Sequence, residues 1–64
     1  MPSPKYLALV RLFDGDEPKE IASDLDVSYA TVLRYKRELN TAQDEGKVNS
    51  LLAAEQGVLD NMAQ

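Results

Sequence analysis

The chain contains 64 residues, with seven basic and eleven acidic side chains, a formal net charge of -4, and neither cysteine nor histidine. A chain of this length forms at most one domain with a marginal core, and without cysteine or histidine it has no disulfide bond and no expected structural zinc site. The longest apolar run, YLALV, is too short to cross a membrane, and the N-terminus lacks the pattern of a signal peptide. We therefore expect a cytoplasmic protein without membrane association, which gains stability by assembling with other copies.

The first predicted helix spans residues 4–14. Ser3 is suited to cap it, and Pro4 fits the first helical position. Gly15 favours the left-handed backbone that ends a helix. Apolar residues at helical spacing predict the buried stripe, which consists of Tyr6, Leu9, Val10 and Phe13.

A short second helix is predicted over residues 18–25. Asp16 or Glu17 is placed to cap it, and acidic residues interact favourably with its positive end. Its buried stripe consists of Ile21, Ala22 and Leu25. A turn over residues 26–28 follows, and Ser28 is suited to cap the next helix.

The third predicted helix spans residues 29–41 and separates apolar from basic side chains. Its inward stripe consists of Val32, Tyr35 and Leu39, and its outward face holds Tyr29, Ala30, Leu33, Arg34 and Arg37. The polar segment NTAQDEG, which ends in Gly46, predicts a break in the chain after this helix.

Apolar residues at helical spacing in residues 47–64 predict a fourth helix, which Gly57 weakens. No segment alternates with the period of a strand, so the expected fold is all-α. It comprises a three-helix core over residues 1–41, followed by a fourth helix or tail over residues 42–64. This last segment has three interpretations: a satellite helix that completes the core, a helix that joins subunits of a homo-oligomer, or a tail that orders on a partner.

Charge is unevenly distributed along the chain. Six of the seven basic residues precede Glu38, and five of the eleven acidic residues lie from Glu38 onward. The first half is therefore close to neutral and can hold a basic face, which is the electrostatic mark of nucleic-acid binding. The acidic second half is expected to repel nucleic acid and to lie away from it.

The segment from Pro18 to Arg37 resembles the helix-turn-helix of DNA-binding proteins. Its apolar residues match the buried positions of that motif: Ile21, Ala22, Leu25, Val27, Val32 and Tyr35. Asp26 stands where the family most often has glycine, and aspartate tolerates the left-handed backbone expected there. The resemblance implies that the third helix enters the major groove of duplex DNA with its first residues near the base edges.

The candidate DNA-binding residues follow from this arrangement. Small or hydroxyl side chains at the start of the third helix suit contacts with phosphates, bases and thymine methyl groups. Arg34 is the candidate for a bidentate contact with guanine, whereas the other basic residues are candidate phosphate contacts. The complete set is Lys5, Lys19, Ser28, Tyr29, Ala30, Thr31, Arg34, Lys36 and Arg37.

Each of these interpretations has a structural alternative. The basic residues of the third helix are also compatible with an ordinary solvated face. Tyr29 suits either a packed rim position or a DNA contact, and Tyr35 is expected in the core. Leu33, an apolar residue on the outward face, suits either contact with thymine methyl groups or packing against the tail or a second subunit, and packing is favoured.

The wider arrangement is similar to the N-terminal part of a phage terminase small subunit. The resemblance covers about the first 50 residues and rests on YLALVRLFDGDEPKEIASDLDVSYATVLRY, the continuation RELNTAQDEGKVNSLL and the acidic, apolar tail. It implies a ring-forming protein in the host cytoplasm that recognises viral DNA and presents it to a separate packaging ATPase-nuclease. The chain would then be one domain of a longer protein.

Two other functions remain open at this point. One is a small transcriptional regulator of the repressor type, and the other is a protein-interaction module that binds no DNA. An enzyme is not expected, because the sequence holds no phosphate-binding glycine loop and no nucleophile paired with a base. No cofactor and no metal site are expected either.

Overall fold

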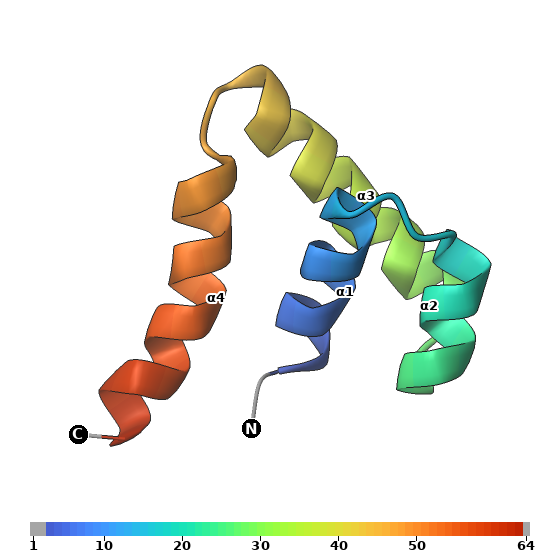
Figure 1. The fold of residues 1–64 in the computed structure, drawn as a ribbon, viewed down its shortest axis with the longest axis horizontal. Helices are drawn as coiled ribbons and strands as arrows, with labels where there is room; N and C mark the ends of the chain where they lie inside the picture. Colours follow the sequence, from blue (N-terminus) through green and yellow to red (C-terminus); the bar gives the residue numbers. More distant parts are fainter. Residues whose placement is uncertain (1–2, 64) are drawn as a thin grey trace.

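The computed structural model describes the backbone of residues 3–63 and the side chains of residues 3–56. These residues form four helices and no strand, and the all-α prediction is confirmed. The helices are α1 (Pro4–Phe13), α2 (Pro18–Leu25), α3 (Tyr29–Asp44) and α4 (Val48–Ala63). Helices α1, α2 and α3 pack on one another, whereas α4 turns back from the end of α3 and contacts both α1 and α3 (Figure 1).

The predicted caps of α1 and α3 are confirmed. The Ser3 hydroxyl accepts a hydrogen bond from the Tyr6 backbone N–H at 3.1 Å, and the Ser28 hydroxyl accepts one from the Thr31 N–H at 3.1 Å. For α2, Glu17 occupies the predicted cap position, but its side chain makes no capping hydrogen bond. The other predicted cap, Asp16, accepts instead from the side chain of Arg11 at 2.8 Å.

The first three helices end in the same way. At each end one N–H reaches back three residues and the next N–H reaches back five, around a left-handed residue, which is the Schellman arrangement. The left-handed residues are Gly15 with φ 92°, Asp26 with φ 55° and Gly46 with φ 68°. The expected glycine stop after α1, the left-handed Asp26 and the break at Gly46 are therefore confirmed.

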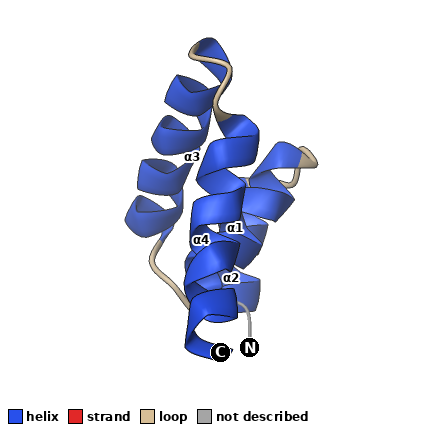
Figure 2. Ribbon diagram, turned by 90° about the vertical axis from the view of Figure 1, so that its left-hand side faces the viewer, coloured by secondary structure: helices blue, strands red, loops and turns tan. Residues whose placement is uncertain are grey.

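The core forms where α1, α2 and α3 meet. Figure 2 views the molecule from the side of α4, which lies in front of α1 and α2. Leu9, Ile21 and Val32 have no exposed surface, and Ala22 is 9% exposed. Half-buried apolar side chains pack around this core: Leu12, Leu25, Val27 and Tyr35. The inward positions predicted for α2, for the turn and for α3 are thus confirmed.

The predicted stripe of α1 is confirmed in part. Leu9 is fully buried and Tyr6 and Val10 are half-buried, but Ala8, which was not predicted, is also fully buried, and Phe13 is 54% exposed. The small Ala8 side chain faces the core that α2 and α3 complete, and Leu12 packs beside it. Phe13, the last residue of α1, is left at the surface, so its predicted burial is wrong.

Helix α3 extends past its predicted end at residue 41 to Asp44. Leu39 and Ala42 are buried on its inner side, so packing continues beyond the predicted boundary. The segment after Leu39 contains no helix breaker before Gly46, and α3 therefore continues until just before this glycine.

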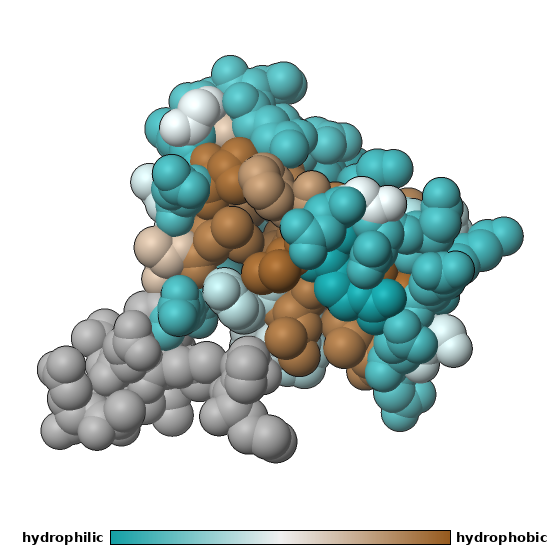
Figure 3. Space-filling model, viewed as in Figure 1, coloured by the Kyte–Doolittle hydropathy of each residue, from teal (hydrophilic) through white to brown (hydrophobic). Residues whose placement is uncertain are grey.

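The fourth predicted helix is present as α4, and its Val48, Leu51 and Leu52 side chains are half-buried. The apolar positions predicted further along lie outside the described side chains: Val58, Leu59 and Met62. A band of apolar residues crosses the middle of the face viewed in Figure 3, with polar residues on both sides of it over the described part of the chain.

Candidate nucleic-acid interface

The turn between α2 and α3 fixes where α3 begins and which residues it presents. Asp26 adopts the left-handed conformation, and Val27 packs against the core. Because Ser28 caps the helix, Tyr29 and Ala30 follow directly on the surface, with Tyr29 44% exposed. The start of α3 is therefore accessible to a large ligand.

Ser28 and Thr31 are already hydrogen-bonded to each other. Their side-chain oxygens lie 2.7 Å apart, and Thr31 is half-buried while Ser28 is exposed. Each hydroxyl retains further hydrogen-bonding capacity toward a ligand. Their assignment to bases or phosphates stays a prediction.

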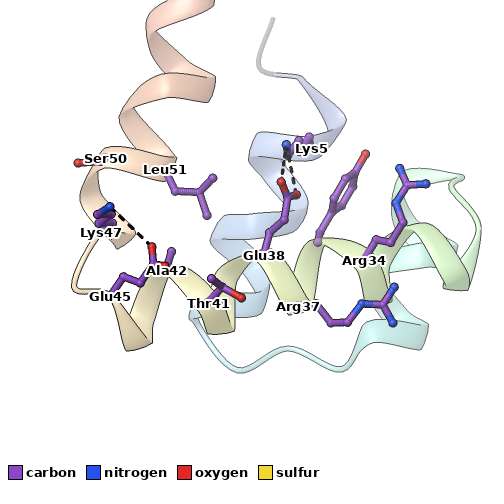
Figure 4. Close-up of a pocket in the computed structure, with 11 residues that line it drawn as sticks. Lys5, Arg34, Arg37, Glu38, Thr41, Ala42, Glu45, Lys47, Ser50 and Leu51 are labelled. Carbon is purple, nitrogen blue, oxygen red and sulfur yellow. Dashed lines mark hydrogen bonds and ion pairs between the residues drawn. The ribbon is translucent and has the colours of Figure 1, made fainter.

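Arg34 and Arg37 share one exposed side of α3. They are three residues apart, so they project about 60° from each other around the helix axis. Both side chains line the open space between α3 and α4 (Figure 4). Leu33 also belongs to the predicted outward face, but it is half-buried.

Lys36 lies on a different side of α3. It projects about 100° from Arg37 and about 160° from Arg34, and it borders a shallow depression beside Asp16 and Glu17, in the α1–α2 loop. The three basic residues, which fall within four consecutive positions of the sequence, therefore flank α3 on two sides. This spacing suits a helix lying between two phosphate chains, because cations are then available to each.

The basic residues outside α3 are largely engaged with carboxylates. Lys5 Nζ lies 3.2 Å from Glu38 and 3.1 Å from Glu55. Arg11 binds Asp16 at 2.8 Å and Asp24 at 2.7 Å. These hydrogen bonds, the one to Asp16 first, raise the pKa of Arg11.

The basic residues of α3 differ from Lys5 and Arg11 in their salt bridges. Within the described side chains, five salt bridges engage Lys5, Arg11 and Lys47, and none engages a basic residue of α3. Arg34, Lys36 and Arg37 are all exposed. The guanidinium and ammonium groups of α3 are thus open to an external anion.

Lys19 and Tyr29 connect the starts of α2 and α3. The Lys19 ammonium lies 6.0 Å from the centre of the Tyr29 ring, at the limit of a cation–π contact. Both side chains are exposed. The pair thus adds a cation and an aromatic ring to the surface formed by the start of α3.

An open groove of about 880 Å³ lies between α3 and α4 (Figure 4). Its lining includes the side chains of Tyr35, Ala42 and Leu51 together with charged residues of both signs. The charged residues are Lys5, Arg34, Arg37, Glu38, Glu45 and Lys47. The groove is therefore mixed in charge, and Arg34 and Arg37 border it together with Glu38 and Glu45.

The described residues contain no cluster of three or more carboxylates with the geometry of a metal site. No helix in the described part of the chain is long and apolar enough to span a bilayer. No family model, curated protein or solved structure matches the chain.

The sequence indicated neither the partners of Lys5 nor the double salt bridge of Arg11. Glu38 and Glu55 are 33 and 50 positions from Lys5 in the chain, so no local spacing relates them. Arg11 and Asp16 are five residues apart across the α1–α2 turn. A sequence pattern could have indicated this pair, because a basic residue stands before the glycine of the turn and an acidic residue follows that glycine directly.

Proposed function

We propose that this chain binds duplex DNA through the exposed side of α3, as a helix-turn-helix. One observation carries the proposal: within the described side chains, the basic residues of α3 are exposed and without carboxylate partners, whereas Lys5, Arg11 and Lys47 are paired. A net charge of -4 does not oppose it, because DNA responds to the local field of the face that it meets.

In the proposed complex, different residues of α3 contact the bases and the phosphates. Arg34 contacts guanine in the major groove, since its fork of donors matches guanine O6 and N7. Lys36 and Arg37, about 100° apart around the helix axis, bind phosphates on different sides of the helix. Ala30 permits close approach of the backbone, and Lys19 with Tyr29 contacts the phosphate chain near the start of α3.

The test compares two variants that each lose one positive charge. We expect Arg34→Ala to weaken binding to a preferred duplex by about 1–3 kcal/mol, measured by fluorescence anisotropy. Lys47→Ala is the matched control, because Lys47 lies outside α3 and already faces Glu45 at 3.7 Å. Equal losses from both variants, with helicity intact by circular dichroism, would refute a specific role for α3.

Salt dependence supplies the second readout. Each phosphate contact releases counterions, so the logarithm of the affinity falls with the logarithm of salt concentration by about 0.9 per contact. We expect Arg37→Ala and Lys36→Ala each to reduce this slope by about one unit. Binding that is absent or indifferent to salt favours the protein-interaction module, for which the exposed Leu7 and Phe13 are candidate contacts.

We further propose that the DNA recognised is viral and that the chain acts in genome packaging as part of a terminase small subunit. A homo-oligomer suits this role, and the half-buried apolar residues of α4 are candidates for contacts between copies: Val48, Leu51 and Leu52. Light scattering measures the number of copies. A neighbouring gene for a large packaging ATPase favours packaging, whereas a binding site inside a promoter favours the transcriptional regulator.

A further inference from the structure

Lys5 connects three helices through one ammonium group. From α1 it reaches Glu38 of α3 at 3.2 Å and Glu55 of α4 at 3.1 Å, and it lies 5.8 Å from the centre of the Tyr35 ring. The Lys5, Glu38 and Glu55 side chains are 29%, 47% and 25% exposed. Glu38 and Glu55 thus converge on the same cation at the edge of the groove between α3 and α4.

Glu38 also has a neighbour of opposite charge on its own helix. Arg34 precedes it by four residues, and side chains at this spacing meet on one side of a helix. In the structure the Glu38 carboxylate points toward Lys5, while the Arg34 side chain extends away from it (Figure 4). Within the described side chains, Arg34 forms no salt bridge.

We infer that Lys5 is a positioning residue for the α3 interface: by holding Glu38, it prevents that carboxylate from pairing with Arg34 and leaves the guanidinium available to a ligand. The inference rests on the proposed function for its effect on DNA, but the pairing itself does not depend on DNA. It gives Lys5 an indirect role in place of the direct phosphate contact that its charge alone indicates.

The alternative state is accessible because it needs only rotation of two side chains. Once the Lys5 ammonium is removed, Glu38 can pair with Arg34, which lies four residues before it on the same side of α3, and a DNA phosphate must then displace a carboxylate to reach Arg34. Glu55 cannot substitute in this role, since it lies on α4 and its contact in the structure is with Lys5. The effect on DNA binding should therefore depend on Glu38 and not on Glu55.

The test is a double-mutant cycle on DNA affinity, measured by fluorescence anisotropy. Lys5→Met is expected to weaken binding about two- to fivefold, because an i,i+4 ion pair now competes with the DNA. Lys5→Met combined with Glu38→Gln is expected to bind at least as tightly as the unaltered chain. Glu55→Gln is the matched control: it removes the α4 contact of Lys5 and should leave affinity unchanged.

Other results of the cycle overturn the inference. If Lys5 touches phosphate directly, Lys5→Met weakens binding equally in the Glu38→Gln background. If Lys5 acts only by holding α4 against α1 through Glu55, Glu55→Gln weakens binding as much as Lys5→Met does. Thermal unfolding by circular dichroism verifies that each variant is folded at the temperature of the titration.

A measurement without DNA separates this inference from the proposed function. In the NMR spectrum, the Nε–H signal of Arg34 should shift in Lys5→Met and return in the Lys5→Met, Glu38→Gln double variant. An unchanged signal overturns the inference even if the chain binds DNA. A shifted signal in a chain that binds no DNA refutes the proposed function and leaves the positioning of Arg34 by Lys5 established.

Discussion

The side-chain oxygens of Ser28 and Thr31 lie 2.7 Å apart, and the Ser28 oxygen also accepts a hydrogen bond from the Thr31 backbone N–H at 3.1 Å. These two contacts close the first turn of α3. Ser28 therefore supports the helix that carries the candidate interface before any ligand is bound. Two substitutions separate its part in folding from its part in binding.

Ser28→Ala is expected to lower the free energy of unfolding by about 1 kcal/mol, because the N-cap hydrogen bond is lost. Ser28→Asp preserves the cap and places a negative charge at the positive end of α3, so stability should be retained. The same carboxylate would repel DNA phosphates and weaken binding. Urea unfolding and anisotropy titrations measure the two effects. A stable Ser28→Asp variant with unchanged affinity would contradict placement of this turn at the DNA.

Asp26 is expected to limit stability through its backbone conformation. It occupies the left-handed position at the end of α2, where the matching positions after α1 and α3 hold Gly15 and Gly46. Asp26→Val should cost more than about 1 kcal/mol in urea unfolding, since a β-branched residue is strained there.

Two further substitutions at this position serve as controls. Asp26→Gly should match the unaltered chain or exceed it by up to about 1 kcal/mol, because relief of the left-handed conformation is partly offset by the greater freedom of the unfolded chain. Asp26→Asn should stay close to the unaltered chain, since asparagine also tolerates this conformation. Equal stability of the Val and Gly variants would contradict the argument.

Ala22 and Ala30 provide a matched pair of alanines on consecutive helices. Ala22 is 9% exposed within the core, whereas Ala30 is exposed on α3. Ala22→Leu should cost about 1–3 kcal/mol in unfolding free energy, because three further carbons inside the packed core force its neighbours to shift. Ala30→Leu should change stability by less than about 0.5 kcal/mol but weaken DNA binding, because the larger side chain holds the α3 backbone away from the base edges. Unchanged affinity of Ala30→Leu would contradict the proposed contact face.

The parts of the fold that depend on local chemistry were predictable from the sequence. Ser3 and Ser28 cap helices through bonds to residues three positions on, and Gly15 and Gly46 end them through their own backbone freedom. The inward positions of α2 and α3 were also predictable, because each helix offers a single apolar stripe. The bounds of α2 also agree with the prediction, because Pro18 suits the first turn of a helix and Asp26 ends the helix in the left-handed conformation.

The parts that depend on distant contacts were not predictable. In α1 the helical spacing supports more than one apolar stripe, and only the positions of α2 and α3 decide that Ala8 is buried and Phe13 is not. The α3 end was missed because Ala42 packs inside a polar-looking segment. For the candidate site, the sequence indicated the exposed residues of α3. It did not indicate which basic side chains form salt bridges, because their carboxylate partners come from other segments of the chain.

Arg11 is expected to hold α2 in place through two carboxylates from different segments. Its Nε lies 2.8 Å from Asp16 in the α1–α2 loop, and its Nη1 lies 2.7 Å from Asp24 in α2. Arg11→Met should lower the midpoint of thermal unfolding. Arg11→Lys should restore little of the loss, because a single ammonium does not reproduce the fork of guanidinium donors.

Salt provides a control for the Arg11 variants. Exposed ion pairs weaken as ionic strength rises, so the difference between Arg11→Met and the unaltered chain should narrow in high salt. Lys47→Met, which removes a pair with Glu45 between more exposed side chains, should melt close to the unaltered chain. An Arg11→Lys variant with the full midpoint would show that the second carboxylate contributes nothing.

Lys5 should make the free energy of unfolding depend on pH in the alkaline range. Burial lowers the pKa of Lys5, but its hydrogen bonds and charge interactions with Glu55 and Glu38 outweigh this, and the pKa is raised above its usual value of 10.5. A raised pKa in the folded state means that the contribution of Lys5 is fully present below pH 10.5 and is lost as pH rises through the folded-state pKa.

The measurement is the free energy of urea unfolding of Lys5→Met and Lys5→Arg between pH 8 and strongly alkaline pH. Lys5→Met should be less stable than the unaltered chain by less than about 1 kcal/mol at the lower pH, because the pair is largely solvated. That difference should disappear at the alkaline end, where the unaltered lysine is neutral. Lys5→Arg keeps its charge throughout and should retain its advantage over Lys5→Met. A difference between Lys5→Met and the unaltered chain that persists at the alkaline end would mean that Lys5 stabilises the fold through its aliphatic stem rather than through Glu38 and Glu55.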